Sequence, residues 1–201
     1  MIRIDTEGKT GKELYPLLTS AVVPRPIAWV STLGEEGQLN VAPFSYFNLV
    51  STRPPILMIS VGEREGVPKD TARNILREKE FVVHIVSHPW LHAMNETAIE
   101  VDASISEADL VGLTPVASTH LKTPGIKEAL VRFECTYDQH INYPHSTLLF
   151  GKIKAIHVDE TVLQNNRIDI KTLHPVARLG GVEYSTLGDV IKIARPKGDP
   201  R

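Results

Sequence analysis

The strongest constraint on this sequence is a succession of short β-type segments that do not alternate with helices. Apolar, aromatic and β-branched residues concentrate in eight candidate strands, at residues 26–33, 38–42, 44–51, 56–61, 81–86, 130–140, 147–158 and 190–193. Turn-forming glycines and prolines are spread along the whole chain. Candidate helices are fewer, at residues 69–79, 88–98 and 106–110. This pattern favours a mainly β fold, a closed barrel with peripheral helices, over a parallel α/β sheet.

Length and charge narrow the class of protein further. The 201 residues are 42% hydrophobic and 23% charged, which fits a single domain over residues 1–201 with a core that needs no disulfide or metal. The formal net charge of −2 argues against a dedicated nucleic-acid-binding protein. The single cysteine, Cys135, fits a reducing compartment. With no targeting segment and no apolar run of about 20 residues, we expect a cytoplasmic protein without a membrane partner.

The first candidate site combines Ser31-Thr32 with the segment 40–45, where two strands and a turn are expected to meet. The small side chains of Ala42, Pro43 and Ser45 would let a flat ligand approach the main chain. Pro43 removes a ladder donor and therefore suits a sheet edge or a bulge. The alternative is a plain hairpin with a proline bulge.

The second candidate site is Lys69-Asp70-Thr71, which opens a predicted helix with Asp70 as its N-cap. Free main-chain N–H groups and the helix dipole favour an anion there. The Lys69 ammonium and the Thr71 hydroxyl donor would suit a phosphate. The alternative is a solvated, capped helix start.

The third candidate site lies in the segment 174–184. Arg178 could form a bidentate pair or touch a ligand, and Tyr184 could stack on a ring. Gly180 and Gly181 allow a positive φ and close approach of the main chain. The alternative is a turn held by a structural arginine.

Metal and nucleophile chemistry find little support in the sequence. His88 and His92 are four residues apart, but the intervening residues lack the general base of a metalloprotease helix. His84 within an apolar strand indicates a satisfied core or cavity-wall imidazole. Cys135 on a strand indicates an inert buried thiol. We therefore predict no metal site and assign no catalytic side chain.

Several segments, taken in order, resemble the flavin reductase-like, FMN-binding split-barrel family, in particular its flavoredoxin-like branch. The resemblance extends over about residues 15–190 and rests on the ordered set rather than on any one motif. The matching segments are Arg25–Thr32, Asn40–Asn48, Ser51–Pro55, Lys69–Ile75 and His174–Tyr184. One departure is His84, which stands where many relatives have asparagine.

The resemblance implies a split barrel that forms a homodimer, with FMN near the subunit interface. It also implies hydride transfer from NADH or NADPH to flavin N5, chemistry that the cofactor itself supplies. Alternatives are a flavoredoxin-type electron-transfer protein and a non-catalytic FMN-binding module, and an electron-accepting protein or monooxygenase is a further partner. The implied cofactor-binding residues are Ser31, Thr32, Ala42, Pro43, Phe44, Ser45, Lys69, Asp70, Thr71, Arg178 and Tyr184.

Overall fold

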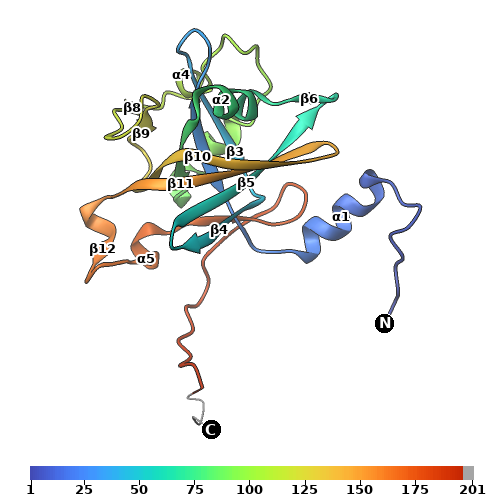
Figure 1. Cartoon of the computed structure of the whole chain (residues 1–201). Coiled ribbons are helices and arrows are strands. Elements are labelled where there is room, and N and C mark those ends of the chain that lie inside the picture. Colours follow the sequence, from blue (N-terminus) through green and yellow to red (C-terminus); the bar gives the residue numbers. More distant parts are fainter. Residues whose placement is uncertain (197–201) are drawn as a thin grey trace.

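The structure is a computed structural model that describes residues 1–196 (Figure 1). The helices are α1 (Gly11–Ala21), α2 (Asp70–Glu78), α3 (Leu91–Glu96), α4 (Glu107–Leu110) and α5 (Ile170–Leu173), with 3₁₀ turns η1 (His88–Trp90) and η2 (Glu160–Val162). The long strands are β2 (Ala28–Leu33), β3 (Leu39–Phe44), β4 (Phe47–Thr52), β5 (Pro55–Arg64), β7 (Glu80–Ile85), β10 (Val131–Tyr143) and β11 (Ser146–Val158). The short strands are β1 (Arg25–Pro26), β6 (Val67–Pro68), β8 (Pro115–Val116), β9 (Gly125–Ile126), β12 (Leu163–Gln164), β13 (Arg167–Ile168), β14 (Val176–Arg178) and β15 (Tyr184–Thr186).

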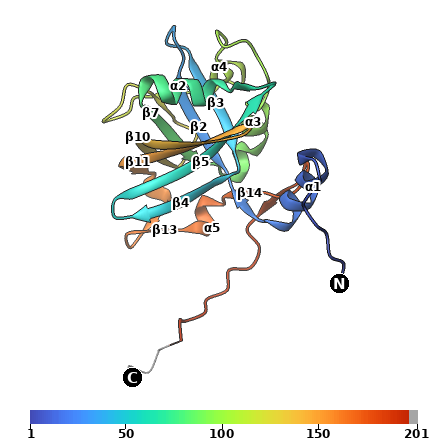
Figure 2. The same ribbon diagram turned by 45° about the vertical axis from the view of Figure 1, so that its right-hand side comes forward.

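The long strands form one curved antiparallel sheet in the order β3-β2-β7-β10-β11-β5-β4, with β6 on β5 (Figures 1 and 2). Alternate side chains of this sheet face two different cores, as the two-residue period of a strand requires. On the inner face, Val30, Ile59 and Phe81 form one buried cluster that α2 helps to cover. On the other face, Trp29 and Met94 belong to a second cluster under α3 and α4. The strand β3 pairs only with β2, so its other edge is open.

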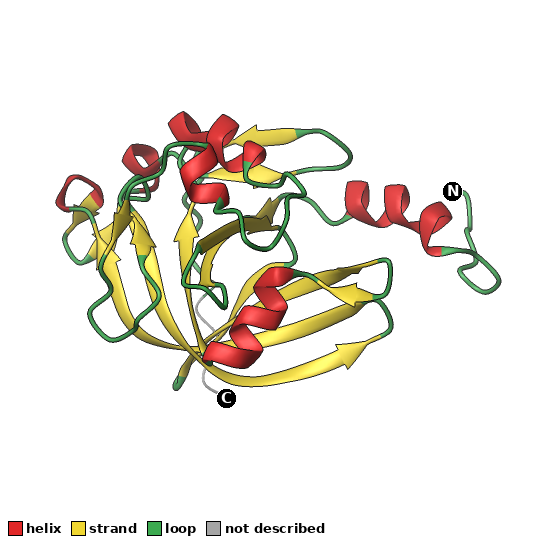
Figure 3. Cartoon of the chain, turned by 90° about the horizontal axis from the view of Figure 1, so that it is seen from above, coloured by secondary structure: helices red, strands yellow, loops and turns green. Residues whose placement is uncertain are grey.

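The helix α1 stands away from the barrel (Figure 3). Thr10 and Glu13 form a capping box at its start, in which each side chain accepts the main-chain N–H of the other residue. The buried guanidinium of Arg25 ties its other end to the barrel by donating to the carbonyls of Thr19 and Val22, at 2.6 and 2.7 Å. No helix among residues 1–196 is long and apolar enough to span a bilayer.

The mainly β barrel with peripheral helices is confirmed, and most predicted strands are present with shifted ends. The strand predicted at 190–193 is wrong, because that segment lies beyond the last sheet strand and pairs with nothing in the described part of the chain. The helix predicted at 88–98 is shorter, with η1 followed by α3. Asp70 is the first residue of α2 and Lys69 is its N-cap, so the predicted cap was displaced by one residue. The helix α1 was not predicted.

Candidate functional site

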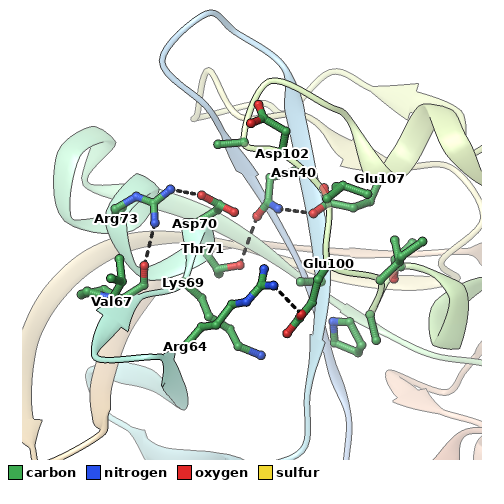
Figure 4. A pocket seen from close by; sticks show the side chains of 18 of the residues that line it. Asn40, Arg64, Val67, Lys69, Asp70, Thr71, Arg73, Glu100, Asp102 and Glu107 are labelled. Atoms are coloured by element: carbon green, nitrogen blue, oxygen red, sulfur yellow. Dashed lines mark hydrogen bonds and ion pairs between the residues drawn. The ribbon is translucent and has the colours of Figure 1, made fainter.

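A cleft of about 700 Å³ lies between the open edge of β3 and the start of α2 (Figure 4). Its volume falls in the range typical of small-molecule and cofactor sites. The β5–β6 turn forms one side and the segment 97–103, after α3, forms the other. The small side chains of Ala42 and Pro43 on β3 leave room for a flat ligand against the sheet edge.

The first turn of α2 faces this cleft without a side-chain cap. Ala72 N–H donates to the Lys69 carbonyl at 3.0 Å, which leaves the N–H groups of Asp70 and Thr71 for a ligand. Lys69 lines the cleft and makes no salt bridge among the residues that the structure describes. Asp70 is turned to Arg73, which neutralises its charge. This end of the cleft can therefore accept an anion.

The opposite wall is held by two contacts between distant segments. Arg64 on β5 forms a salt bridge of 2.9 Å to Glu100, across the cleft (Figure 4). The indole of Trp29, fully buried in β2, donates to the Thr97 hydroxyl at 2.8 Å. The first contact is exposed and weak, whereas the second is buried and fixes where the wall begins.

The edge of β3 offers few free main-chain donors to the cleft. Val41 N–H points out of the sheet and donates to the Glu107 carboxylate at 3.1 Å. Pro43, two residues further, faces the same way and has no N–H, as its predicted place at a sheet edge allows. An electron-rich ring lying on this edge would therefore find no free donor at either position.

Glu107, at the start of α4, is almost fully buried and also lines the cleft. Burial raises the pKa of its carboxyl, and N–H groups of Val41 and the Asn40 side chain oppose that rise. Val41 N–H donates to one carboxyl oxygen and the Asn40 side-chain nitrogen lies 2.8 Å from the other, and hydrogen bonds of this kind favour the ionised form.

Six of the predicted site residues line the cleft together, and five do not. Those in the cleft are Ala42, Pro43, Phe44, Lys69, Asp70 and Thr71. Ser31 and Thr32 are fully buried beside it, with their hydroxyls donating to the Pro124 carbonyl and to Asn40. The Ser45 hydroxyl faces Arg25, 3.5 Å from Nε. A cofactor role for all eleven residues stays a prediction.

Arg178 and Tyr184 lie on neighbouring strands, β14 and β15, outside the lining of the cleft. The guanidinium stacks 4.5 Å from the centre of the tyrosine ring and hydrogen-bonds its hydroxyl. That hydroxyl donates to Asn95 in α3 at 2.7 Å. Within one copy of the chain, the pair joins the small sheet β1-β14-β15 to α3.

His84 and Cys135 are buried groups outside the cleft, so of the two environments expected for His84 the structure shows the core one, and Cys135 is buried as expected. The His84 ring bonds the Trp29 carbonyl and Ile126 N–H, at 2.8 and 3.0 Å. Burial raises the pKa of the Cys135 thiol, and the nearby Glu134 charge adds to the rise. Among residues 1–196, no three His, Cys, Asp or Glu side chains are grouped to hold a metal ion.

Sequence reasoning missed Arg64, Glu100 and Glu107 as residues of the cleft. Asn40 belonged to the candidate segment 40–45 but was not among the predicted cofactor-binding residues. Glu107 could only have been suggested by its place in a short capped helix, which gives no reason to bring it to β3. Arg64 and Glu100 are 36 positions apart and meet only in the folded chain.

The chain belongs to the flavin reductase like domain family, which it matches over residues 20–174. It is 39% identical to nitrilotriacetate monooxygenase component B from Bacillus cereus, with 96% of this chain and 98% of that chain covered and a TM-score of 0.94. It is 32% identical to the 2-nitrobenzoate 2-nitroreductase NbaA of Pseudomonas fluorescens, with 100% and 99% covered and a TM-score of 0.90.

More distant structures share the fold. A protein with a split barrel domain from Shewanella frigidimarina is 18% identical, with 98% of this chain and 100% of that chain covered and a TM-score of 0.85. The flavoredoxin of Desulfovibrio vulgaris (Miyazaki F) is 21% identical, with 96% and 97% covered and a TM-score of 0.77. The predicted split barrel of the flavin reductase-like family is confirmed.

Proposed function

We propose that this chain is an FMN-binding oxidoreductase that takes hydride from NADH or NADPH. One observation carries the proposal: an uncapped helix start and Lys69, which has no salt-bridge partner among residues 1–196, face the same cleft as the small side chains of β3. Membership of the flavin reductase like family supports a flavin as the ligand. We further propose that the protein works in the cytoplasm, where its single free thiol would stay reduced.

The residues of the cleft fit the two chemically different ends of FMN. Lys69 and the N–H groups of Asp70 and Thr71 would hold the phosphate, because they offer positive charge and donors together. Ala42, Pro43 and Phe44 would support the ring, because they leave an apolar surface at the sheet edge. Bound FMN would supply hydride acceptance at N5 from nicotinamide C4, and this explains why the cleft needs no nucleophile or acid–base pair.

Replacing Lys69 by alanine tests the phosphate end. Loss of a charge-assisted contact should weaken FMN binding by about 1–3 kcal/mol, which is roughly 5- to 150-fold in Kd. Riboflavin, which lacks the phosphate, should bind the variant and the unchanged protein equally. The measurement is quenching of flavin fluorescence during titration with protein.

Lys79 provides the matched control, since it ends the same helix and its ammonium lies 4.4 Å from the centre of the Tyr137 ring. Lys79→Ala should leave FMN affinity unchanged. Equal affinities for FMN in Lys69→Ala and the unchanged protein would place the phosphate elsewhere.

Rapid anaerobic mixing with NADH and with NADPH tests the reaction itself. Bleaching of flavin with turnover supports a reductase. The 39% identity to a monooxygenase component B favours a reductase that hands reduced flavin to a separate oxygenase, and the 32% identity to a nitroreductase makes a nitroarene a second acceptor to test. Bleaching by a protein donor but not by nicotinamide would instead indicate an electron-transfer protein of the flavoredoxin type.

We also propose that the working form is a homodimer. Large apolar side chains are exposed on α1 and on the outer strand β4, namely Tyr15, Leu17, Leu18, Leu49 and Val50. Exposed large apolar side chains on neighbouring positions of one element are typical of interaction sites. Sedimentation of the flavin-loaded protein as a monomer would contradict this proposal.

A further inference from the structure

A row of buried polar side chains runs behind the wall of the cleft, from α2 through β2 and β3 to α4. Asn74 donates to the Thr32 hydroxyl at 3.1 Å. The hydroxyls of Thr32 and Thr71 both lie near the Asn40 side-chain oxygen, at 3.0 and 3.1 Å. The Asn40 side-chain nitrogen lies 2.8 Å from Glu107 (Figure 4). All five side chains are buried, so water cannot readily replace these partners.

The Glu107 carboxylate determines which way the Asn40 amide points. One of its oxygens accepts Val41 N–H, which belongs to the main chain and cannot turn around. While Glu107 is ionised, its other oxygen has no proton to give, so Asn40 presents its NH₂ group there. The Asn40 oxygen therefore faces the two threonines.

In this orientation of the Asn40 amide, the hydroxyl protons of Thr32 and Thr71 are both used in hydrogen bonds to it. An amide oxygen can only accept, so Thr32 and Thr71 each donate to it. The remaining lone pairs of Thr32 accept from Asn74, which completes that side of the row. Thr71 keeps lone pairs but no proton for a ligand in the cleft. The role of Thr71 as a hydroxyl donor to phosphate stays a prediction, and it would require the Thr71 proton to leave Asn40.

We propose that Glu107 is a positioning residue that, through Asn40, keeps the Thr71 hydroxyl from donating to an anion at the start of α2. The inference rests on the proposed function, because the anion it concerns is the FMN phosphate. In this arrangement only main-chain N–H groups and Lys69 hold the phosphate, and an acceptor oxygen of Thr71 faces it. The buried carboxylate thus limits the affinity of the cleft for FMN.

The substitution Glu107→Gln should reverse the direction of the hydrogen bonds along this row of side chains. Val41 N–H still requires an acceptor, so the oxygen of the new amide must face it and its NH₂ group must face Asn40. Asn40 then turns its oxygen toward residue 107 and its NH₂ group toward the threonines. The Thr71 proton is released and becomes available to the phosphate.

A double-mutant cycle of Glu107→Gln and Thr71→Val tests this coupling, with Kd for FMN and for riboflavin measured by fluorescence titration. In the unchanged background, Thr71→Val should alter the Kd for FMN by about twofold or less, because the hydroxyl gives nothing to the phosphate. In the Glu107→Gln background the same substitution should weaken FMN binding about tenfold or more, the worth of a hydrogen bond to a charged group. For riboflavin, Thr71→Val should change the Kd by the same factor in both backgrounds.

Two results would overturn the inference. One is an equal effect of Thr71→Val on FMN affinity in both backgrounds. The other is the same coupling for riboflavin, which would mean repacking of the cleft rather than a contact to phosphate. Failure of the proposed function gives a different pattern. In that case Lys69→Ala alone leaves the affinity for FMN unchanged, whatever the double-mutant cycle shows.

Asn40→Ala supplies an independent route if Glu107→Gln does not fold. It removes the acceptor of both hydroxyl protons but leaves Val41 N–H bonded to Glu107. The released Thr71 hydroxyl should then make Thr71→Val costly for FMN, again by about tenfold, and not for riboflavin. Thermal melts of all variants verify that folded proteins are compared.

Discussion

The buried His84 ring should make the protein sensitive to mild acid. The Trp29 carbonyl requires a proton on Nδ1, and Ile126 N–H requires a lone pair on Nε2. A second proton on the ring would set two N–H groups against each other at Nε2. Burial above all, and the Arg132 charge in addition, lower the pKa of His84 from 6.5 to about 3, although the Trp29 carbonyl acts the other way.

The magnitude follows from the linkage between protonation and folding. Below pH 6.5 the unfolded chain takes up a proton at this histidine and the folded protein does not, so the free energy of unfolding falls as the pH falls. Each pH unit between 6.5 and about 3 costs about 1.4 kcal/mol. From pH 7 to pH 5 the loss from this one group is about 2 kcal/mol.

Urea unfolding at pH 7 and pH 5 measures this loss, with His84→Gln as the variant that cannot titrate. The unchanged protein should lose about 2 kcal/mol more than the variant between the two pH values, because all other titrating groups cancel in the comparison. His92→Gln, which removes an exposed histidine, should behave like the unchanged protein. Equal losses in the unchanged protein and in His84→Gln would refute the reasoning.

Two further predictions concern the barrel core. Gly151→Ala should lower the free energy of unfolding by about 1–3 kcal/mol in urea titrations, because a Cβ there would overlap the Phe81 ring and lie 3.0 Å from the Cys135 Cβ. Gly62→Ala on the neighbouring strand is its control and should cost less, since the added carbon meets nothing closer than 3.9 Å. The Cys135 thiol, whose pKa is raised by burial, should not react with a thiol reagent until the protein unfolds. Rapid labelling of the native protein would show that the core opens locally.

The strands were predictable because the pleat leaves a period of two in the sequence. Trp29 and Val30 are neighbours that face different cores, and Pro43 marked an edge before any pairing was known. The helix α2 was predictable from the apolar face around Ile75. The helix α1 was missed, although its capping box of Thr10 and Glu13 was a local signal.

Local sequence patterns gave a wrong prediction where a strand needs a neighbouring strand to pair with. Residues 190–193 have strand propensity, but no strand lies beside them to complete a ladder. Propensity alone does not stabilise a strand, because its main-chain groups need a neighbour. Arg178 and Tyr184 matched the family pattern, and within one chain they bond each other and Asn95, so their cofactor role stays a prediction.

The sequence by itself determined the class of fold and the two ends of the cleft, because β periodicity, Pro43 and the Lys69 helix start are local properties. Only the tertiary structure brought Glu107 from α4 to Asn40 on β3 and so decided the direction of the hydrogen bonds at Thr71. The physical reason is that the direction of a hydrogen bond depends on every partner in the row, and these partners lie far apart along the chain.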